Sequence, residues 1–547
     1  MKIDVKQEAS AETVITELTW ERVFLNVKID APCVTNIEFA LQNQADKELI
    51  VITPDNYVDG TYYFSINMTA ADGSRFLGNS SWEFVAIHDH HFLHCTVNKE
   101  VGCSLSEMSR VFRYGKRNRY AYTVTFQVKA DDNENPALVL DSYFMIVNDH
   151  WDKRRFVEEA RSVTEKIRAA GVSCAVLFVN TLYRALRLTH RKSRRNILLM
   201  DETRDDISGN LKAIDDRMAE RGLAKTWNVS YSFQTVVEKS LFSFSWLKLV
   251  FLISKQDVIV LDNYAPLFSV LKLDSSVKVV QVWHSGGGFK AVGYCRFGKQ
   301  GSPYPVGSCH KAYTHVIVGS KHLVKVFEEV FGVERAAIYP IGMPRQDQFL
   351  DMQRVSRVKE RLFEEYPDLE SKSVVLFAPT YRGSSQKYAS YDYNQLDLEK
   401  IHRYCVDTDS LFLVKMHPFV KEQIQIPTEY QDRILDFTSY RDLNELFYVA
   451  DILITDYSSA YYEYAMLIRP ILFYTFDREF YERSRGVWQS VKEAAPGRVC
   501  DTFEELMAAL RNKDYDLYKV KQFVEENFDT YSTNVTDTVL DQIICAE

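Results

Sequence analysis

Hydrophobic and polar positions follow a β-strand pattern over the first part of the chain. Short hydrophobic and aromatic runs cover 21–30, 60–70, 81–97, 121–130 and 138–147. Polar turn sequences such as PDN, ADG and DDNENP separate them. Apolar runs of this length, bounded by Gly, Pro, Asn and Asp, are typical of strands. Regularly spaced short strands predict a β-sandwich-like domain over residues 1–148.

The pattern becomes helical near Trp151. The segment 172–196 places apolar residues at helical spacing and then becomes strongly basic. The apolar positions are Val176, Val179, Leu182, Tyr183 and Leu186, and the basic ones are Arg184, Arg187, Arg191, Lys192, Arg194 and Arg195. A basic amphipathic helix suits an anionic membrane surface. We therefore interpret 149–195 as a helical, membrane-associating linker, with a buried helix that ends in a solvated basic tip as the equal alternative.

Strand and helix signals alternate from Asn196 to the end, which is typical of doubly wound parallel sheets. The expected strands are 196–201, 257–262, 277–283, 315–320, 373–379, 411–417, 451–456 and 470–475. The expected helices are near 209–221, 237–253, 321–331, 441–449, 459–468 and 503–527. The sequence Gly342-Met343-Pro344-Arg345 precedes a highly charged helix and is the predicted joint between two α/β domains, 196–345 and 346–547. We expect the last helical segment to pack back across that joint.

Composition limits the protein class. Hydrophobic residues make up 46% and charged residues 26%, so disorder, collagen and a coiled coil are excluded as the main architecture. The nine cysteines show no C-x-x-C spacing, which argues against a disulfide framework and a zinc ribbon. The N-terminus resembles no signal peptide, and no uncharged apolar run reaches about 18 residues. We expect a cytoplasmic protein.

Charge is distributed unevenly. Residues 153–195 hold twelve Lys and Arg against three Glu, a local charge of +9, so the rest of the chain carries −18 to reach the total of −9. Because the basic stretch is an isolated, peripheral helix and the remainder is acidic, nucleic acid is not an expected partner.

Polar and glycine residues follow the predicted strands of both α/β domains. His284, Gly286, Gly287 and Gly288 follow the strand at 277–283, and His417 follows the strand at 411–416. Thr380 and Arg382 follow the strand at 373–378, and Asp456, Ser458 and Ser459 follow the strand at 451–455. In open α/β sheets, ligands bind beyond the carboxyl ends of the strands. We therefore expect these residues to line one ligand site.

Each of these residues is suited to a phosphate-bearing ligand. Consecutive glycines let backbone N–H groups approach an anion, and a helix N-terminus such as that after Ser458 and Ser459 favours phosphate. Arg382 can donate two parallel hydrogen bonds to phosphate oxygens. A histidine can exchange a proton near neutral pH. Taken singly, each feature is more often a cap or a turn, so the prediction of a phosphate site depends on their convergence.

Several other chemistries lack support. There is no G-x-G-x-x-G, Walker A or H-E-x-x-H motif. Asp407-Thr408-Asp409 precedes its strand and is interpreted as a surface turn. Histidines 88, 90, 91 and 94 with Cys95 could suggest a metal, but alternate strand residues face opposite sides, so we interpret them as surface residues. We expect catalysis without a metal or another cofactor.

Residues 196–530 resemble the CDP-glycerol glycerophosphotransferase family, which makes teichoic acids and related phosphopolyol capsules. The resemblance rests on four motifs: QVWHSGGGFKAVGY, FAPTYRG, LVKMHPF and ILITDYSSAYYEYAMLIRPILFYTFDREFY. It covers about 60% of the chain and excludes the β-rich N-terminal part. It implies a GT-B architecture of two facing Rossmann-like domains, and transfer of a polyol phosphate from a CDP-polyol to an acceptor hydroxyl with release of CMP.

The resemblance also assigns roles to residues of this sequence. His284 becomes the general base for the acceptor hydroxyl, and His417 holds the donor pyrophosphate or assists CMP departure. Arg382, Ser458 and Ser459 would neutralise phosphate charge, and Asp456 would orient its loop. Two further residues join the donor-binding set, Glu463 near the ribose and Arg345 at the hinge. Thr380 and the three glycines 286–288 complete that set.

The implied partners are a CDP-polyol, a lipid-linked acceptor and the inner face of an anionic membrane. A homo-oligomer is compatible with the sequence, which does not specify the oligomeric state or the polyol. Two other functions remain open at this point. One is a GT-B glycosyltransferase with a nucleotide-sugar donor, and the other is a catalytically silent scaffold that binds a wall polymer through the β domain.

Overall fold

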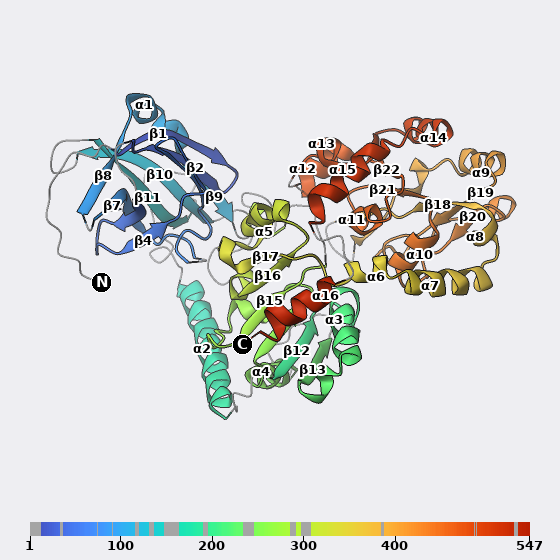
Figure 1. The fold of residues 1–547 in the computed structure, drawn as a ribbon, viewed down its shortest axis with the longest axis horizontal. Coiled ribbons are helices and arrows are strands. Elements are labelled where there is room, and N and C mark those ends of the chain that lie inside the picture. Colours follow the sequence, from blue (N-terminus) through green and yellow to red (C-terminus); the bar gives the residue numbers. More distant parts are fainter. Residues whose placement is uncertain are drawn as a thin grey trace.

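The computed structural model contains three lobes in the order of the sequence (Figure 1). A β domain and two α/β domains follow one another, and the first α/β domain lies between the other two. The structure describes residues 13–32, 37–73, 75–89, 91–114, 120–130, 136–146, 163–189, 195–233, 245–284, 292–296, 308–383, 388–485, 487, 489–529 and 534–546.

The N-terminal domain consists mainly of β-strands whose buried side chains form one apolar core. Its strands are β1 (Thr13–Glu21), β2 (Phe24–Asp30), β3 (Glu38–Asn43), β4 (Leu49–Ile52), β5 (Asn56–Val58), β6 (Thr61–Asn67), β7 (Ser80–His88), β8 (His91–Val97), β9 (Arg110–Tyr114), β10 (Tyr120–Ala130) and β11 (Pro136–Ile146). A single helix, α1 (Lys99–Met108), is described among them. The domain is β-rich as predicted, but its strands belong to one connected eleven-stranded sheet, with β1 and β8 in parallel. The prediction of a two-sheet sandwich is therefore not confirmed.

The β domain is fixed to the first α/β domain by apolar and charged contacts. Tyr294 of the α/β domain is fully buried and joins the core of the β domain, where its ring lies 5.6 Å from that of Phe76. The Arg22 guanidinium Nε donates to both carboxylate oxygens of Glu329, at 2.7 and 3.0 Å. Asn67 Nδ2 donates to the carbonyl of Glu328 at 3.0 Å. The β domain is thus attached to the first α/β domain through residues near Tyr294 and Glu329.

The first α/β domain contains a six-stranded parallel sheet in the order β13-β12-β14-β15-β16-β17. Its strands are β12 (Asn196–Asp201), β13 (Asn228–Phe233), β14 (Val258–Leu261), β15 (Lys278–Gln281), β16 (His315–Val318) and β17 (Ile338–Pro340). Its helices include α3 (Gly209–Glu220), α4 (Ser245–Ser254) and α5 (Val324–Phe331). The strand order reverses between β12 and β14, which is where ligands bind in doubly wound sheets.

The second α/β domain contains another six-stranded parallel sheet in the order β20-β19-β18-β21-β22-β23. Its strands are β18 (Ser373–Phe377), β19 (Ser410–Val414), β20 (Ile434–Asp436), β21 (Ile452–Thr455), β22 (Ile471–Tyr474) and β23 (Arg498–Cys500). Helices α6 (Gln346–Leu350), α7 (Met352–Glu365) and α8 (Asp368–Ser371) lead into it. The other helices are α9 (Leu398–Asp407), α10 (Leu443–Val449), α11 (Ala460–Ala465), α12 (Arg478–Arg485), α13 (Val491–Ala494), α14 (Phe503–Asn512) and α15 (Leu517–Asn527). The order reverses between β18 and β21, so a second ligand edge lies there.

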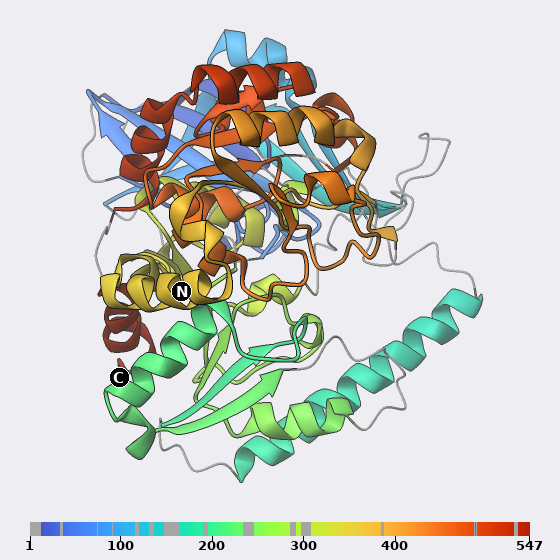
Figure 2. The ribbon, with the colours of Figure 1, turned by 90° about the vertical axis from the view of Figure 1, so that its right-hand side faces the viewer.

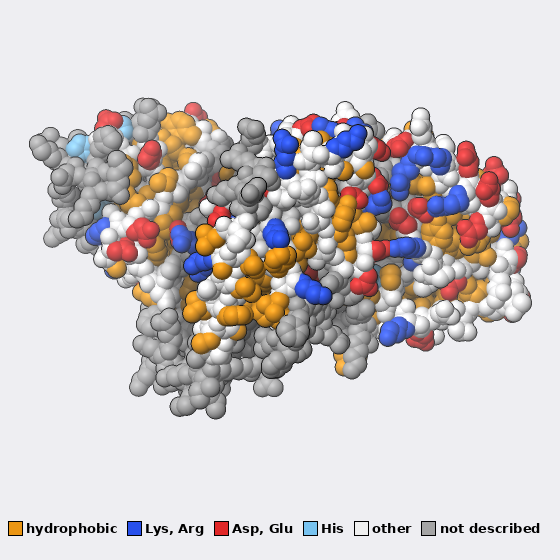
Figure 3. All heavy atoms as spheres, turned by 90° about the horizontal axis from the view of Figure 1, so that it is seen from below, with side chains coloured by type: hydrophobic (Ala, Val, Ile, Leu, Met, Phe, Trp, Pro, Cys, Tyr) orange, Lys and Arg blue, Asp and Glu red, His pale blue; other side chains and the backbone are white. Residues whose placement is uncertain are grey.

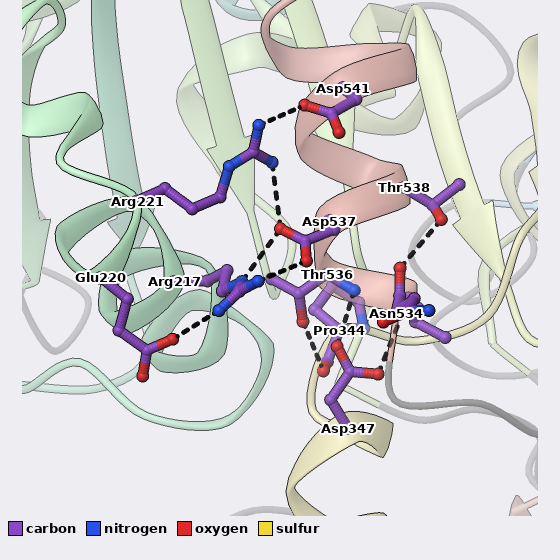
Figure 4. Close-up of polar contacts among 11 residues, drawn as sticks. Arg217, Glu220, Arg221, Pro344, Asp347, Asn534, Thr536, Asp537, Thr538 and Asp541 are labelled. Atoms are coloured by element: carbon purple, nitrogen blue, oxygen red, sulfur yellow. Dashed lines mark hydrogen bonds and ion pairs between the residues drawn. The ribbon is translucent and has the colours of Figure 1, made fainter.

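The C-terminal helix α16 (Val535–Val539) returns to the first α/β domain (Figure 4). Asp537 accepts hydrogen bonds from Arg217 and Arg221 of the α3 region, at 2.6 to 3.0 Å. Asp347 accepts from the first backbone N–H groups of the helix, and Val535 and Val539 are buried against the first sheet. The predicted boundary 346–547 is therefore wrong for these last residues, because their apolar face completes the core of the first domain.

Helix α2 (Val163–Leu188) lies along the outer side of the first α/β domain (Figure 2). Tyr183 is buried, and Val179, Leu182 and Leu186 pack against the core of that domain. The predicted apolar face thus contacts protein, because the first domain has an apolar surface to cover there.

The position of Arg187 in α2 differs from the prediction. We expected it on a basic membrane face, but it is buried and its Nη1 donates to the carbonyl of Gln256 at 2.6 Å. Its Nη2 lies 3.8 Å from a carboxylate oxygen of Asp257. Arg184 and Arg195 are exposed, whereas Arg191, Lys192 and Arg194 lie outside the described residues. Arg187 therefore anchors the helix to the protein.

Candidate active site

His284 follows β15 at the carboxyl edge of the first sheet, close to the point where the strand order reverses. Its backbone N–H donates to the carbonyl of Asp262, which follows β14, at 3.0 Å. Its ring Nδ1 lies 3.1 Å from the same carbonyl oxygen. Because a carbonyl only accepts, Nδ1 carries the proton and Nε2 keeps its lone pair. Burial lowers the pKa of His284, so the ring is neutral at neutral pH.

The backbone before His284 is held by a buried asparagine of α3. Asn210 Nδ2 donates to the carbonyls of Trp283 at 2.8 Å and Val282 at 3.2 Å, and to Asp262 Oδ1 at 3.1 Å. Trp283 has a φ of +40°, which is unusual for a residue with a bulky side chain. Its ring packs against Phe331, with 5.2 Å between ring centroids. This network fixes a strained turn from which the imidazole projects.

Arg345 and Glu463 join the two α/β domains beside this turn. Arg345 Nη2 donates to the carbonyl of His284 at 2.7 Å and also forms a short ion pair with Glu463 of α11. The backbone N–H of Arg345 donates to Asn210 Oδ1 at 3.1 Å. All three side chains are buried. The two predicted donor-site residues thus contact each other and the loop that carries His284.

The edge of the second sheet is organised by Asp456, which follows β21. Its Oδ1 accepts the backbone N–H groups of Thr380 at 2.7 Å and Ser458 at 3.2 Å. The hydroxyl of Ser458 accepts the N–H of Ala460 at 3.3 Å, and Ser459 begins α11 without a side-chain cap. The loops after β18 and β21 are therefore tied into one unit.

Arg382 lies between two carboxylates of the same unit. Its Nη1 donates to Asp456 Oδ2 at 2.8 Å and to the carbonyl of Thr380 at 2.9 Å. Its Nε and Nη2 donate to the two carboxylate oxygens of Asp477, at 2.6 and 2.9 Å. Burial alone would lower the pKa of Arg382, but Asp456 and Asp477 raise it, so the guanidinium is permanently charged. The Arg382 guanidinium therefore makes four hydrogen bonds to protein groups, three of them to carboxylate oxygens.

His417 follows β19 on the same edge. Its Nδ1 accepts the backbone N–H of Phe419 at 3.2 Å, so in the neutral ring the proton is on Nε2. Its ring lies 4.8 Å from that of Tyr381 and 4.6 Å from that of Phe419, between centroids. In their neutral forms, His417 and His284 are therefore opposite tautomers, with the proton on Nε2 of His417 and on Nδ1 of His284.

The remaining predicted features are placed as follows. Gly286, Gly287 and Gly288 lie outside the described residues. Asp409 is paired with Arg433 at the amino end of β19, at the edge opposite His417. His94 Nδ1 lies 2.5 Å from Glu83, and no group of three or more His, Cys, Asp or Glu side chains within the described ranges is placed to hold a metal ion. None of the described helices is both long and apolar enough to span a membrane.

The model of the family "CDP-Glycerol:Poly(glycerophosphate) glycerophosphotransferase" matches residues 182–545, about two thirds of the chain. The chain belongs to this glycerophosphotransferase family. It is an enzyme of the CDP-polyol phosphotransferase type, as the family resemblance implied.

Curated relatives and a solved structure agree with this membership. The chain is 31% identical to the teichoic acid ribitol-phosphate polymerase TarL of Staphylococcus aureus, over 79% of this chain and 76% of TarL. It is 32% identical to the ribitol-phosphate polymerase TarK of the same organism, over 79% of this chain and 84% of TarK. The structure of the wall teichoic acid polymerase TagF superimposes with a TM-score of 0.52 at 20% identity, over 70% of this chain and 97% of TagF. The last comparison shows a shared fold.

Three residues important to this glycerophosphotransferase site were missed by the sequence reasoning. Asn210 holds the turn before His284, the Asp262 carbonyl sets the imidazole tautomer, and Asp477 binds Arg382. Asp262 is the last residue of the predicted strand 257–262, and Asp477 follows the predicted strand 470–475 by two residues, so the strand-end rule could have found them. Asn210 begins a helix, and no sequence signal distinguishes it from an ordinary first-turn residue.

Proposed function

We propose that this glycerophosphotransferase transfers ribitol phosphate from CDP-ribitol to the terminal hydroxyl of a lipid-linked teichoic-acid-type acceptor and releases CMP. The choice of ribitol is supported by TarL and TarK, the ribitol-phosphate polymerases that the chain resembles over 79% of its length. We also propose a GT-B arrangement, in which the acceptor binds the first α/β domain and the donor binds the second. The two six-stranded parallel sheets, and the Arg345–Glu463 ion pair that links their domains, support that arrangement.

The observation that carries the mechanism is the pair of hydrogen bonds at the Nδ1 atoms of His284 and His417, from which we infer opposite tautomers. His284 Nε2 accepts the proton of the acceptor hydroxyl. The hydroxyl oxygen attacks the phosphorus that bears the polyol. A new P–O bond forms between the acceptor oxygen and this phosphorus. The P–O bond between this phosphorus and the bridging oxygen breaks, and its electron pair leaves with that oxygen as part of CMP. His417 Nε2–H donates to a phosphate oxygen and stabilises the departing negative charge. This reaction needs positioning and charge stabilisation more than covalent chemistry.

The unit formed by the loops after β18 and β21 is the proposed donor cradle. Asp456 fixes the backbone of Thr380 and Ser458 beside the start of α11, where we place a donor phosphate. Arg382 is buried between Asp456 and Asp477, so we assign it to holding the cradle rather than to binding phosphate directly. Preorganised groups of this kind stabilise developing charge without a reorganisation cost.

The donor assignment is tested by product analysis. The purified protein is incubated with an acceptor and with CDP-ribitol or CDP-glycerol, and the added unit is identified by mass spectrometry. We expect CDP-ribitol to give a kcat/KM at least tenfold higher than CDP-glycerol. Equal or preferential use of CDP-glycerol would contradict the choice of polyol and leave the reaction class intact.

We further propose that α2 and α4 place the enzyme on the inner face of the membrane, where a lipid-linked acceptor would reside. Leu177, Phe178 and Leu188 of α2 are 67%, 59% and 88% exposed, and Phe251 of α4 is 46% exposed. Lys255 lies 3.9 Å over the ring of Phe251. Figure 3 shows hydrophobic side chains gathered on the face of the first α/β domain that is seen from below. Exposed apolar side chains beside Lys and Arg suit an anionic lipid surface.

Flotation with phosphatidylglycerol-rich vesicles tests this surface. Leu177→Glu with Phe178→Glu should lower vesicle binding about tenfold or more, because each apolar side chain contributes about 1.5 kcal/mol when it enters an apolar phase. Val51→Glu is the matched control, since Val51 is 62% exposed on the β domain. Equal flotation of the double variant and the wild type would show that α2 does not face the lipid.

A further inference from the structure

Arg345 occupies the point where the two α/β domains and the His284 turn meet. One nitrogen of its guanidinium, Nη2, contacts both the carbonyl of His284 in the first domain and Glu463 in the second. Glu463 belongs to α11, the helix that begins directly after the Asp456–Ser459 loop. A single side chain thus connects the donor cradle to the backbone of the catalytic base.

A second connection from the same residue reaches the turn through Asn210. The Arg345 N–H donates to Asn210 Oδ1, and Asn210 Nδ2 donates to the carbonyls of Val282 and Trp283. Both connections therefore end on three consecutive residues, 282–284. The central one, Trp283, has a positive φ of 40°, a conformation that persists only when surrounding contacts hold it.

The charge and burial of the pair favour a structural link over a ligand site. Arg345 and Glu463 are both buried, with relative accessibilities of 9% and 5%, and the carboxylate is already neutralised by the guanidinium. A buried ion pair depends on both partners, since removal of either leaves an uncompensated charge. A phosphate would have to compete with Glu463 for the same guanidinium.

We propose that Arg345 and Glu463 are positioning residues that couple the donor-binding domain to the orientation of His284. The proposal rests on the proposed function, in which His284 is the general base. It replaces the expectation that Arg345 and Glu463 contact the donor. Binding of the donor beside α11 would hold Glu463, and Arg345 would transmit that constraint to the turn that carries the imidazole.

Steady-state kinetics separate positioning from donor binding. Arg345→Lys keeps the charge but loses the two-sided contact, and Glu463→Gln keeps the shape but loses the charge. We expect each to lower kcat at least tenfold with the donor KM within about twofold of the wild type. The kcat of the double variant should be no lower than that of the less active single variant, because both residues act through the same ion pair. A raised donor KM with unchanged kcat would show instead that Arg345 binds phosphate, for example through its buried Nε, which has no hydrogen-bond partner among the described residues.

A second ion pair between the same domains provides the control. Arg441 of the second domain pairs with Asp206 of the first, but it is 85% exposed and has no described contact with residues 282–284. Arg441→Lys and Asp206→Asn should leave kcat within about twofold of the wild type. A tenfold loss in these variants would mean that any interdomain contact matters, and would overturn the specific role of Arg345.

Histidine NMR tests the proposal without turnover. In the ¹⁵N-histidine-labelled wild type, His284 should show a protonated Nδ1 and an unprotonated Nε2, with its resonance assigned from the His284→Asn variant. Arg345→Lys and Glu463→Gln should shift it toward a mixture of tautomers. An unchanged tautomer in both variants would overturn the proposal. Lack of CMP release by the wild type would count against the proposed function, and the NMR result would still decide the positioning role.

Discussion

His284→Ala should lower kcat by about 10² to 10⁴ while the fold and donor binding persist, which is the usual contribution of a general base. The hydrogen bond from Nδ1 to the Asp262 carbonyl leaves Nε2 with the lone pair that a general base needs. The turn is held through the backbone carbonyls of Trp283 and His284, and the His284→Ala change leaves those hydrogen bonds in place. CMP release under donor and acceptor saturation measures the effect, and His322→Ala, an exposed histidine of the same domain, is the control.

The pH dependence gives an independent check of the same residue. Because burial lowers the pKa of His284 below its ordinary value of 6.5, the base form predominates at neutral pH. Activity should therefore stay constant from pH 8 to 7 and fall only as the pH drops below about 6.5. Full activity of His284→Ala, or a wild-type profile that falls as the pH drops from 8 to 7, would contradict the assignment of the base.

Arg382→Ala should destabilise the second α/β domain by about 3 kcal/mol, the typical cost of removing one partner from a buried ion pair. The change leaves two carboxylates close together. The Asp456 side chain is 1% exposed and the Asp477 side chain is 18% exposed, so water replaces little of the lost interaction. Chemical denaturation measures the free energy of unfolding.

The control for Arg382 is an arginine of the same domain with the same two-bond geometry. Arg478 donates to both carboxylate oxygens of Asp501 at 3.0 and 2.8 Å, but the Asp501 side chain is 40% exposed. Arg478→Ala should cost about 1 kcal/mol or less, since exposed ion pairs contribute little. If Arg382→Ala were as mild as Arg478→Ala and only raised the donor KM, Arg382 would bind phosphate and would not hold the cradle.

The strands found from the sequence are those at the centre of each sheet. Their predicted ranges match β12, β14, β15, β16, β18, β19, β21 and β22 within three residues at either end. The four strands that were missed are β13, β17, β20 and β23, which are the edges of the two sheets. An edge strand is partly exposed, as the burial pattern of β13 illustrates, so it lacks the continuous apolar run of a buried parallel strand.

The site was predictable in position but not in its contacts. The strand-end rule placed His284, His417, Thr380, Arg382, Asp456 and Ser458 on two sheet edges, because the period and polarity of the chain mark where strands end. It did not show that Arg382 would be neutralised by Asp477, or that Arg345 would pair with Glu463. These pairs depend on how loops far apart in the sequence meet, which no local pattern contains.

The β domain and α2 illustrate the same limit. The apolar runs located six of the eleven strands of residues 1–148. The number of sheets depends on how the strands pair, and the eleven strands form one sheet. In α2, the apolar stripe was read correctly as amphipathic, but its partner is the first α/β domain. Arg187 belonged to the predicted basic face and proved to be its anchor, since helical spacing alone does not distinguish a buried from an exposed arginine.

The most direct test of the account is acceptor-dependent release of CMP by the purified wild-type protein supplied with CDP-ribitol. We predict CMP in equal amount to the ribitol phosphate added to the acceptor, with no release from UDP- or GDP-sugars. Release of UDP or GDP from a nucleotide sugar, with no CMP from either CDP-ribitol or CDP-glycerol, would contradict the central claim.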